Sequence, residues 1–297
     1  MGMGEDLLAG SARARDVFNR ASEALGFDVE ELCVSDPEER LNLTEYTQPA
    51  LLTVSMAVWE TLKKYDVNQP AMAAGLSLGE YSALVAGGAL DLEKACVLVR
   101  KRGKYMQEAV PEGVGTMAAI IGLEAETVQQ VCREVEELRG GIVRGANFNC
   151  PGQVVISGDT ETVAAACEAL KAKGARRAIM LRVSAPFHSP LMESAQRKLA
   201  VELEDTQIRE PEFPIITNVE ARATRDPGEI RESLVRQVSS PVRWEESVRV
   251  MVESGIDTFV EAGPGNTLRG FLGRIDRSLN GLGCEKPNEI EEVAGQL

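Results

Sequence analysis

The stretch Gly75-Leu76-Ser77-Leu78-Gly79 lies between a short apolar run, AMAAGL at 71–76, and a helical pattern at 81–89. It matches G-x-S-x-G, in which a serine occupies a sharp turn between a strand and a helix. Glycines on either side of the serine let the two elements approach without a Cβ clash. The serine hydroxyl is then exposed beside the helix N-terminus, whose amides and dipole favour negative charge. Alone the pattern is weak, because a surface loop can produce it by chance. The strand-turn-helix context supports Ser77 as a nucleophile.

A serine nucleophile needs a base, and the sequence contains a single histidine. His188 lies in the Pro-flanked segment SAPFHSP at 184–190. Loops of this kind often carry functional residues, so we predict that His188 is the base, against the alternative of a structural histidine. No acidic residue stands out as a third member. Asp159 is one candidate, and a backbone carbonyl could orient the imidazole instead.

Away from this turn, most of the chain alternates helix and strand, which favours an α/β fold with a parallel sheet flanked by helices. Periodicity predicts helices at 6–26, 47–65, 81–89, 92–109, 227–238 and 244–254, and strands at 71–76, 213–219 and 257–261. The pattern between them differs. Strands at 116–122, 141–147, 153–158 and 177–183, with helices at 125–138 and 160–173, give a βαββαβ order typical of a ferredoxin-like unit. We therefore predict a large domain from residues 1–113 and 185–297, with a small subdomain inserted at 114–184.

The composition excludes several classes of protein. With 44% hydrophobic and 26% charged residues, the 297-residue chain can bury a core. A net charge of −14 disfavours nucleic acid as a partner. The six cysteines form no CxxC pair and no zinc pattern, so we expect free thiols and no metal site. No apolar run reaches about 18 residues and no signal segment is found, so we expect a cytoplasmic protein with no membrane partner.

Further segments, in chain order, carry a family resemblance. They are YTQPAL at 46–51, GLSLGEYSAL at 75–84, RG at 102–103 with MQ at 106–107, NFN at 147–149 with PGQ at 151–153, PFHS at 186–189, Gln237 with SPVRW at 240–244, and EAGPG at 261–265. The series resembles malonyl-CoA:acyl carrier protein transacylases and the related acyltransferase domains of polyketide synthases. The matches run from about residue 3 to residue 275 and together are far more specific than any one motif.

This resemblance implies a hydrolase-like α/β domain with a ferredoxin-like insertion. It implies that Ser77 attacks the thioester of malonyl-CoA while His188 takes its proton, and that the carrier-protein phosphopantetheine thiol then attacks the malonyl-serine ester. By similarity, the main-chain carbonyl of Gln237 orients His188, and the Leu78 N–H contributes to the oxyanion hole. Arg102 would bind the malonyl carboxylate, because a planar charged fork suits that group. Met106, Phe187 and Asn149 are the other expected substrate-binding residues, Phe187 in particular resembling malonyl-selective relatives.

The implied role is malonyl transfer in fatty acid biosynthesis, with malonyl-CoA and acyl carrier protein as partners and no cofactor bound to the enzyme. We expect a monomer, although no pattern in the sequence reports oligomeric state. Acyl carrier proteins are acidic, so docking one on an acidic protein needs a local basic patch. Arg100, Lys101, Arg102 and Lys104 are one candidate cluster, with a solvated helix face as the alternative.

The sequence departs from the family pattern at two places. In the family, a strand and a Gly-Gln-Gly loop precede the position where this sequence opens, and the loop glutamine supplies the second oxyanion N–H. Loss of one such donor lowers the rate by about 10²–10³. In addition, Leu76 stands where many relatives have histidine. Two other functions therefore stay open: a serine esterase or thioesterase, and a catalytically impaired protein that binds coenzyme A or the carrier.

Overall fold

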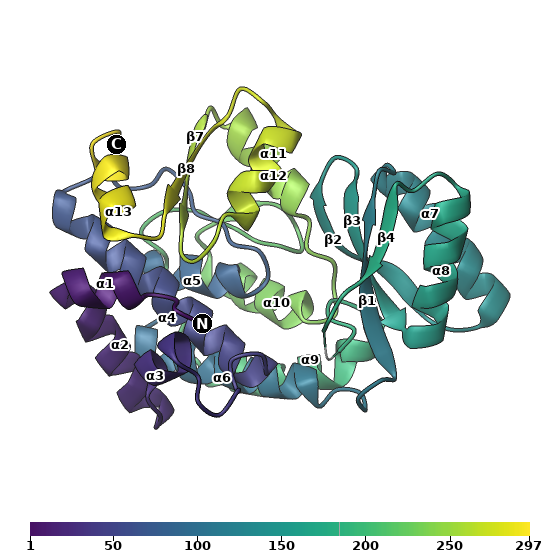
Figure 1. Ribbon diagram of the computed structural model, residues 1–297, viewed down its shortest axis with the longest axis horizontal. Coiled ribbons are helices and arrows are strands. Elements are labelled where there is room, and N and C mark those ends of the chain that lie inside the picture. The colour runs from purple at the N-terminus through teal and green to yellow at the C-terminus, as the bar shows by residue number, and fades with distance from the viewer. Residues whose placement is uncertain (184) are drawn as a thin grey trace.

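The computed structural model describes residues 1–183 and 185–297 and has a mixed α/β architecture. Figure 1 shows three regions: a layer of N-terminal helices, a small sheet with helices α7 and α8 on its outer side, and a C-terminal strand pair beside α11 and α12. Helix α10 lies between these regions in the view.

The N-terminal region is helical up to the serine turn and beyond it. Its elements are α1 Glu5–Gly10, α2 Ala12–Leu25, α3 Val29–Val34, α4 Thr44–Leu62, η1 Lys63–Tyr65, α5 Leu78–Ala86 and α6 Leu92–Gln107.

The single helix predicted at 6–26 is two helices, because Ser11 has an extended backbone and its side chain caps α2 by accepting from the Ala14 N–H. The apolar face of α2, which includes Phe18 and Leu25, is buried. Helix α4 begins at Thr44, three residues before the predicted start at 47, and Leu43 is its N-cap.

The segment predicted as βαββαβ has that element order. It contains β1 Gly115–Ile121, α7 Ala125–Arg139, β2 Val143–Cys150, β3 Gln153–Asp159, α8 Thr160–Ala172 and β4 Arg177–Met180. The strands form one sheet in the order β2-β3-β1-β4, and every neighbouring pair is antiparallel. Helices α7 and α8 pack on this sheet around their own apolar cluster. This is the largest sheet among the described residues, so the observed pairing is mostly antiparallel.

The extended parallel sheet predicted for the rest of the chain is not formed by the segments expected to build it. Residues 71–76 make only a single parallel bridge, between Ala73 and Ile215. The strand predicted at 213–219 is reduced to β5 Ile215–Ile216, which pairs antiparallel with β6 Ala223–Thr224. The run AMAAGL is apolar enough to be buried, but it lacks the β-branched side chains that favour regular strands. The strand predicted at 257–261 does form, and it pairs in parallel with a strand that was not predicted.

In the C-terminal region, α10 and α11 match the helices predicted at 227–238 and 244–254, whereas α9 was not predicted. The elements of this region are η2 Pro190–Met192, α9 Glu193–Glu204, α10 Pro227–Gln237, α11 Trp244–Glu253, β7 Thr258–Ala262, α12 Thr267–Ile275, β8 Asn280–Cys284 and α13 Pro287–Ala294. The acidic C-terminal segment forms α13 and buries Ile290 and Val293 against the helical layer.

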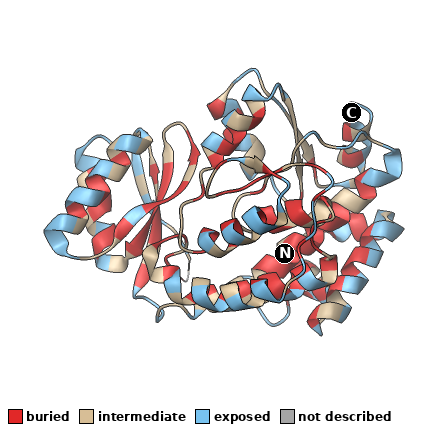
Figure 2. Ribbon diagram, turned by 180° about the vertical axis from the view of Figure 1, so that it is seen from behind, coloured by how far each residue is buried: buried red, intermediate tan, exposed pale blue. Residues whose placement is uncertain are grey.

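Buried residues follow the inner faces of the helical layer and the strands of the small sheet (Figure 2). The largest cluster joins α2, α4, α5, α6 and α9, and a separate one lies under α11 and α12. Within the two described ranges, no helix is both long and apolar enough to cross a membrane.

Candidate active site

The serine turn has the strained geometry that its glycines predict. Ser77 has φ 53° and ψ −101° and is the N-cap of α5, a backbone conformation that L-residues rarely adopt. A Cβ added to Gly75 would lie 2.0 Å from the backbone carbon of Gly79, whereas one added to Gly79 would meet nothing within 4 Å. The close approach therefore requires a glycine at position 75. The structure shows no steric reason for a glycine at position 79.

His188 meets Ser77 as predicted. The Ser77 Oγ lies 2.8 Å from His188 Nε2, and His188 Nδ1 lies 2.8 Å from the main-chain carbonyl of Gln237. Because a carbonyl can only accept, Nδ1 carries the ring proton and Nε2 accepts from the serine hydroxyl. Burial, and then the positive charge of Arg102, lower the pKa of His188 to about 4, so the ring is neutral at neutral pH and its Nε2 can accept a proton.

Arg102 brings a buried positive charge to the serine. It projects from α6 with 1% of its surface exposed. Its Nη2 donates to Ser77 Oγ at 2.9 Å and to Gln237 Oε1 at 2.8 Å, and its Nη1 donates to Gln48 Oε1 at 2.8 Å. The Nε has no partner among the described residues, and no described carboxylate forms an ion pair with this guanidinium. Burial accordingly lowers the pKa of Arg102. A desolvated cation with only neutral partners is a receptor for an anion.

The backbone amide of Leu78 is the first of helix α5. It makes no hydrogen bond in the described parts of the chain. It lies next to Ser77, where the positive end of the helix dipole favours an oxyanion.

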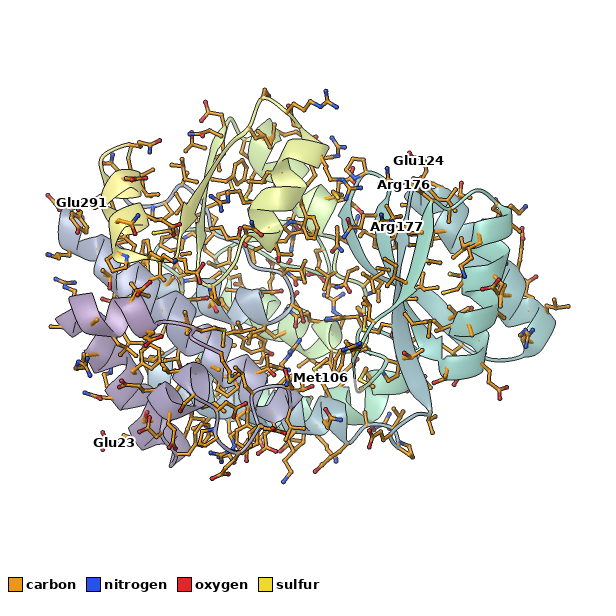
Figure 3. All side chains as sticks on the ribbon, in the orientation of Figure 1. Glu23, Met106, Glu124, Arg176, Arg177 and Glu291 are labelled. Atoms are coloured by element: carbon orange, nitrogen blue, oxygen red, sulfur yellow. The ribbon has the colours of Figure 1, made fainter. Side chains whose placement is uncertain are left out.

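The remaining predicted residues are placed less directly. Met106 is buried on α6, with its sulfur 3.9 Å from Gln48 Nε2, and Figure 3 shows it between the helical layer and the small sheet. Phe187 packs both on the helical core and on the inner side of the small sheet. Asn149 is buried on β2 and its Oδ1 has no partner among the described residues. Asp159 accepts from the Ile142 N–H and does not touch His188, so it is excluded as the third member of the triad.

Comparison with known proteins places this geometry in a family. The model of the acyl transferase domain matches residues 1–289. The chain belongs to the acyl transferase domain family. It is 45% identical over 291 residues to the malonyl CoA-acyl carrier protein transacylase of Bacillus subtilis, covering 98% of this chain and 91% of the relative.

Two solved structures show how closely the fold follows the family. One is a type II PKS acyl-carrier protein in complex with its malonyl-transacylase, which matches with a TM-score of 0.97 and 43% identity over 100% of this chain and 96% of that one. The other is the transacylase of Coxiella burnetii, with a TM-score of 0.97 and 40% identity over 100% and 93% of the two chains.

In this acyl transferase domain, three polar residues that the sequence analysis did not select lie beside the serine. Gln48 holds Arg102, and Glu80 and Asn218 form hydrogen bonds beneath the Ser77 turn. Each has at most 6% of its surface exposed. Glu80 follows the G-x-S-x-G pattern directly and Gln48 lies in an apolar helix, so a polar residue within an apolar segment was the available signal.

The basic cluster predicted on α6 is not a free patch in this acyl transferase domain. Arg100 pairs with Glu45 at 3.0 Å and Lys101 with Glu202 at 2.6 Å. Lys104 lies 3.9 Å from Glu108, and Arg102 is buried in the site. The cluster is therefore mostly neutralised by neighbouring carboxylates.

The six cysteines are free thiols, and all are buried. Among the residues with described positions, no group of His, Cys, Asp and Glu side chains has the arrangement of a metal site.

Proposed function

We propose that the chain transfers the malonyl group of malonyl-CoA to the phosphopantetheine thiol of an acyl carrier protein, through a malonyl ester on Ser77. The observation that carries the proposal is the placement of a buried, carboxylate-free Arg102 at 2.9 Å from the nucleophilic Oγ. An acyl group that ends in a carboxylate supplies the anion that this cation lacks. The names of the relatives, which are malonyl CoA-acyl carrier protein transacylases, support the same substrate.

In the first half-reaction, Ser77 Oγ attacks the thioester carbonyl as its proton passes to His188 Nε2. The Leu78 N–H donates to the developing oxyanion. The carbon–sulfur bond then breaks, and the imidazolium returns the proton to the coenzyme A thiolate. The Gln237 carbonyl holds the ring in the required tautomer and stabilises the imidazolium without itself being charged.

The second half-reaction uses the same groups in reverse. The carrier thiol loses its proton to His188 and attacks the ester carbonyl. Ser77 leaves as the hydroxyl when it regains a proton from the imidazolium. This is a ping-pong sequence that needs a nucleophile, a base and an anion receptor. We propose that it uses no resident cofactor, since coenzyme A and phosphopantetheine arrive as substrate and partner. An esterase would release the acyl group to water, and a binding protein would form no ester.

Carrier docking requires positive charge outside the neutralised α6 cluster. Arg176 and Arg274 flank the tips of the small sheet, next to Gly122 and Gly152 respectively, and Figure 3 shows Arg176 and Arg177 at this edge. Arg176 has no carboxylate partner among the described residues, and Arg274 donates to the neutral Pro151 carbonyl. We propose that the two arginines receive the acidic carrier.

A charge-reversal experiment tests this docking surface. Arg176→Glu with Arg274→Glu should raise the KM for the carrier in a salt-dependent manner without slowing malonyl-CoA loading. Lys64→Glu is the matched control, because this exposed lysine at η1 has no carboxylate partner among the described residues. Loss of loading in the double variant, or an equal effect of the control, would contradict the assignment.

We also propose the finer architecture implied by the resemblance. The strand order β2-β3-β1-β4 supports a ferredoxin-like subdomain at 114–184 inserted between residues 1–113 and 185–297. A cavity of about 520 Å³ lies between residues 70–76 and β7. The parallel β7–β8 pair and the parallel bridge at Ala73 flank this space, which supports a hydrolase-like parallel arrangement around it.

The proposed function is tested by mixing the purified chain with malonyl-CoA alone and measuring its intact mass, followed by peptide mapping. We expect a malonyl adduct on Ser77, absent from Ser77→Ala, that disappears when carrier protein is added and yields malonyl-carrier. Free malonate in place of malonyl-carrier would favour the esterase. A folded chain that forms no adduct would favour the binding protein.

A further inference from the structure

Asn218 forms hydrogen bonds to the backbone of the serine turn at two positions. It follows β5, is completely buried, and lies 141 residues away from Ser77 in the sequence. Its Oδ1 accepts from the Ser77 N–H at 2.6 Å, and its Nδ2 donates to the Gly75 carbonyl at 2.7 Å. One side-chain amide thus binds the backbone immediately before the nucleophile through both its acceptor and its donor.

Asn218 is itself held from two directions. Its N–H donates to Glu80 Oε2 at 3.0 Å, and its carbonyl accepts from the Arg243 N–H at 2.9 Å. Glu80 is fully buried, and the same Oε2 accepts from Gln237 Nε2 at 2.7 Å. The carboxylate therefore joins the residue that holds the serine turn to the residue whose carbonyl orients His188.

The turn needs this restraint because its backbone is strained. A residue such as Ser77, with positive φ, is in a conformation of higher energy that relaxation of the loop would relieve. Relaxation would move Oγ away from His188 Nε2 and turn the Leu78 N–H away from the oxyanion. The hydrogen bonds from Asn218 oppose that movement, together with one from Gln237 Nε2 to the Ser77 carbonyl at 3.0 Å.

We propose that Asn218, anchored by the carboxylate of Glu80, is a positioning residue for acyl transfer that holds Ser77 in its reactive backbone conformation. The side chain of Asn218 contacts the backbone of the serine turn and, at 3.5 Å, Gln237 Nε2, so it acts through Ser77 and not on the thioester. The inference rests on the proposed acylation of Ser77. Acylation of the unmodified chain tests that function independently of any Asn218 variant.

The test measures malonyl-CoA loading in a rapid-quench experiment that separates the acylation rate constant from substrate affinity. Asn218→Ala should acylate about 10²-fold more slowly, because a displacement of about 1 Å has an effect of that size. The KM for malonyl-CoA should stay within about twofold, because displacement of Ser77 weakens contacts that form with the thioester only in the transition state. Thr217→Val is the matched control, because it removes hydrogen bonds to Glu220 and the Arg222 carbonyl in the same loop. Among the described residues the Thr217 side chain forms no hydrogen bond to Ser77, His188 or Asn218, so this variant should load at the normal rate.

Two conservative variants separate positioning from folding. Glu80→Gln retains an oxygen that can accept from Asn218 and Gln237 and should load near the normal rate, whereas Glu80→Ala should be slow like Asn218→Ala. If Asn218→Ala does not fold by circular dichroism, Asn218→Asp replaces it. This variant is isosteric and can still accept from the Ser77 N–H, but it cannot donate to Gly75, and we expect it to be about tenfold slower. A normal rate in folded Asn218→Ala or its Asp replacement, an effect on KM alone, or equal loss in Thr217→Val would overturn the proposal.

Discussion

Replacing Arg102 with methionine tests the anion receptor most directly. Methionine is unbranched and of similar length, so it fills the space without the charge or the hydrogen-bond donors. The hydrogen-bond partners of the guanidinium are neutral, and its Nε–H has no partner among the described residues. A malonyl carboxylate can therefore accept charge-assisted bonds that no protein carboxylate already takes.

The expected magnitude follows from those bonds. Hydrogen bonds to charged groups contribute about 1.5–3 kcal/mol each, and rearrangement of Gln48 and Gln237 offsets part of the loss. A net loss of about 3 kcal/mol corresponds to about a 10²-fold fall in kcat/KM for malonyl-CoA. Acetyl-CoA has no carboxylate, so its kcat/KM should change much less. The ratio of kcat/KM for malonyl-CoA to that for acetyl-CoA should therefore fall sharply.

The assay is stopped-flow or rapid-quench loading with each thioester in parallel. Lys104→Met is the matched control, because it removes a charge from the same helix and disturbs only an exposed pair with Glu108. Equal losses with malonyl-CoA and acetyl-CoA would refute the reasoning, since they would mean that Arg102 acts on the serine and not on the acyl carboxylate.

Three further predictions concern the turn and its buried acids and bases. Because the pKa of His188 is lowered to about 4, loading should be independent of pH near neutrality and should fall only as the pH drops through about 4; a fall centred near 6.5 would contradict the burial argument. Gly75→Ala should destabilise the fold or abolish loading, because the new Cβ would lie 2.0 Å from the backbone carbon of Gly79. Gly270→Ala lies inside α12, where the new Cβ has open space. It should raise the free energy of unfolding by about 1 kcal/mol in a denaturant titration. Burial raises the pKa of Glu80 to about 7, so between pH 4.5 and 7 the unfolded state binds fewer protons than the folded state. The free energy of unfolding should therefore fall by about 3 kcal/mol as the pH rises from about 4.5 to 7. Glu80→Gln should lack this pH dependence, and equal slopes of unfolding free energy against pH for the two proteins would refute the argument.

The sequence by itself predicted the site chemistry and most of the helices. The spacing of glycines around Ser77, together with a single histidine, predicted a nucleophile and its base, and the structure places the two side chains 2.8 Å apart. The resemblance added Arg102 and the Gln237 carbonyl, and the hydrogen bonds place both beside the serine and histidine. The βαββαβ order was equally predictable, since turn residues separate short segments of clear periodicity.

Pairing between distant segments was decided only by the tertiary structure. Residues 71–76 are apolar enough for a strand, yet which edge they pair with depends on neighbours far along the chain, and here only Ala73 pairs. The apparent basic patch on α6 was neutralised for the same reason, because Glu45 and Glu202 come from other helices. Asn218 shows most clearly what the sequence alone could not predict. An asparagine after a short strand carries no local signal, and it acquires a role only because folding brings its amide within 2.6 Å of the Ser77 N–H. Side-chain chemistry can be read from residue type and spacing, whereas hydrogen bonds across 141 residues depend on the packing of the whole core.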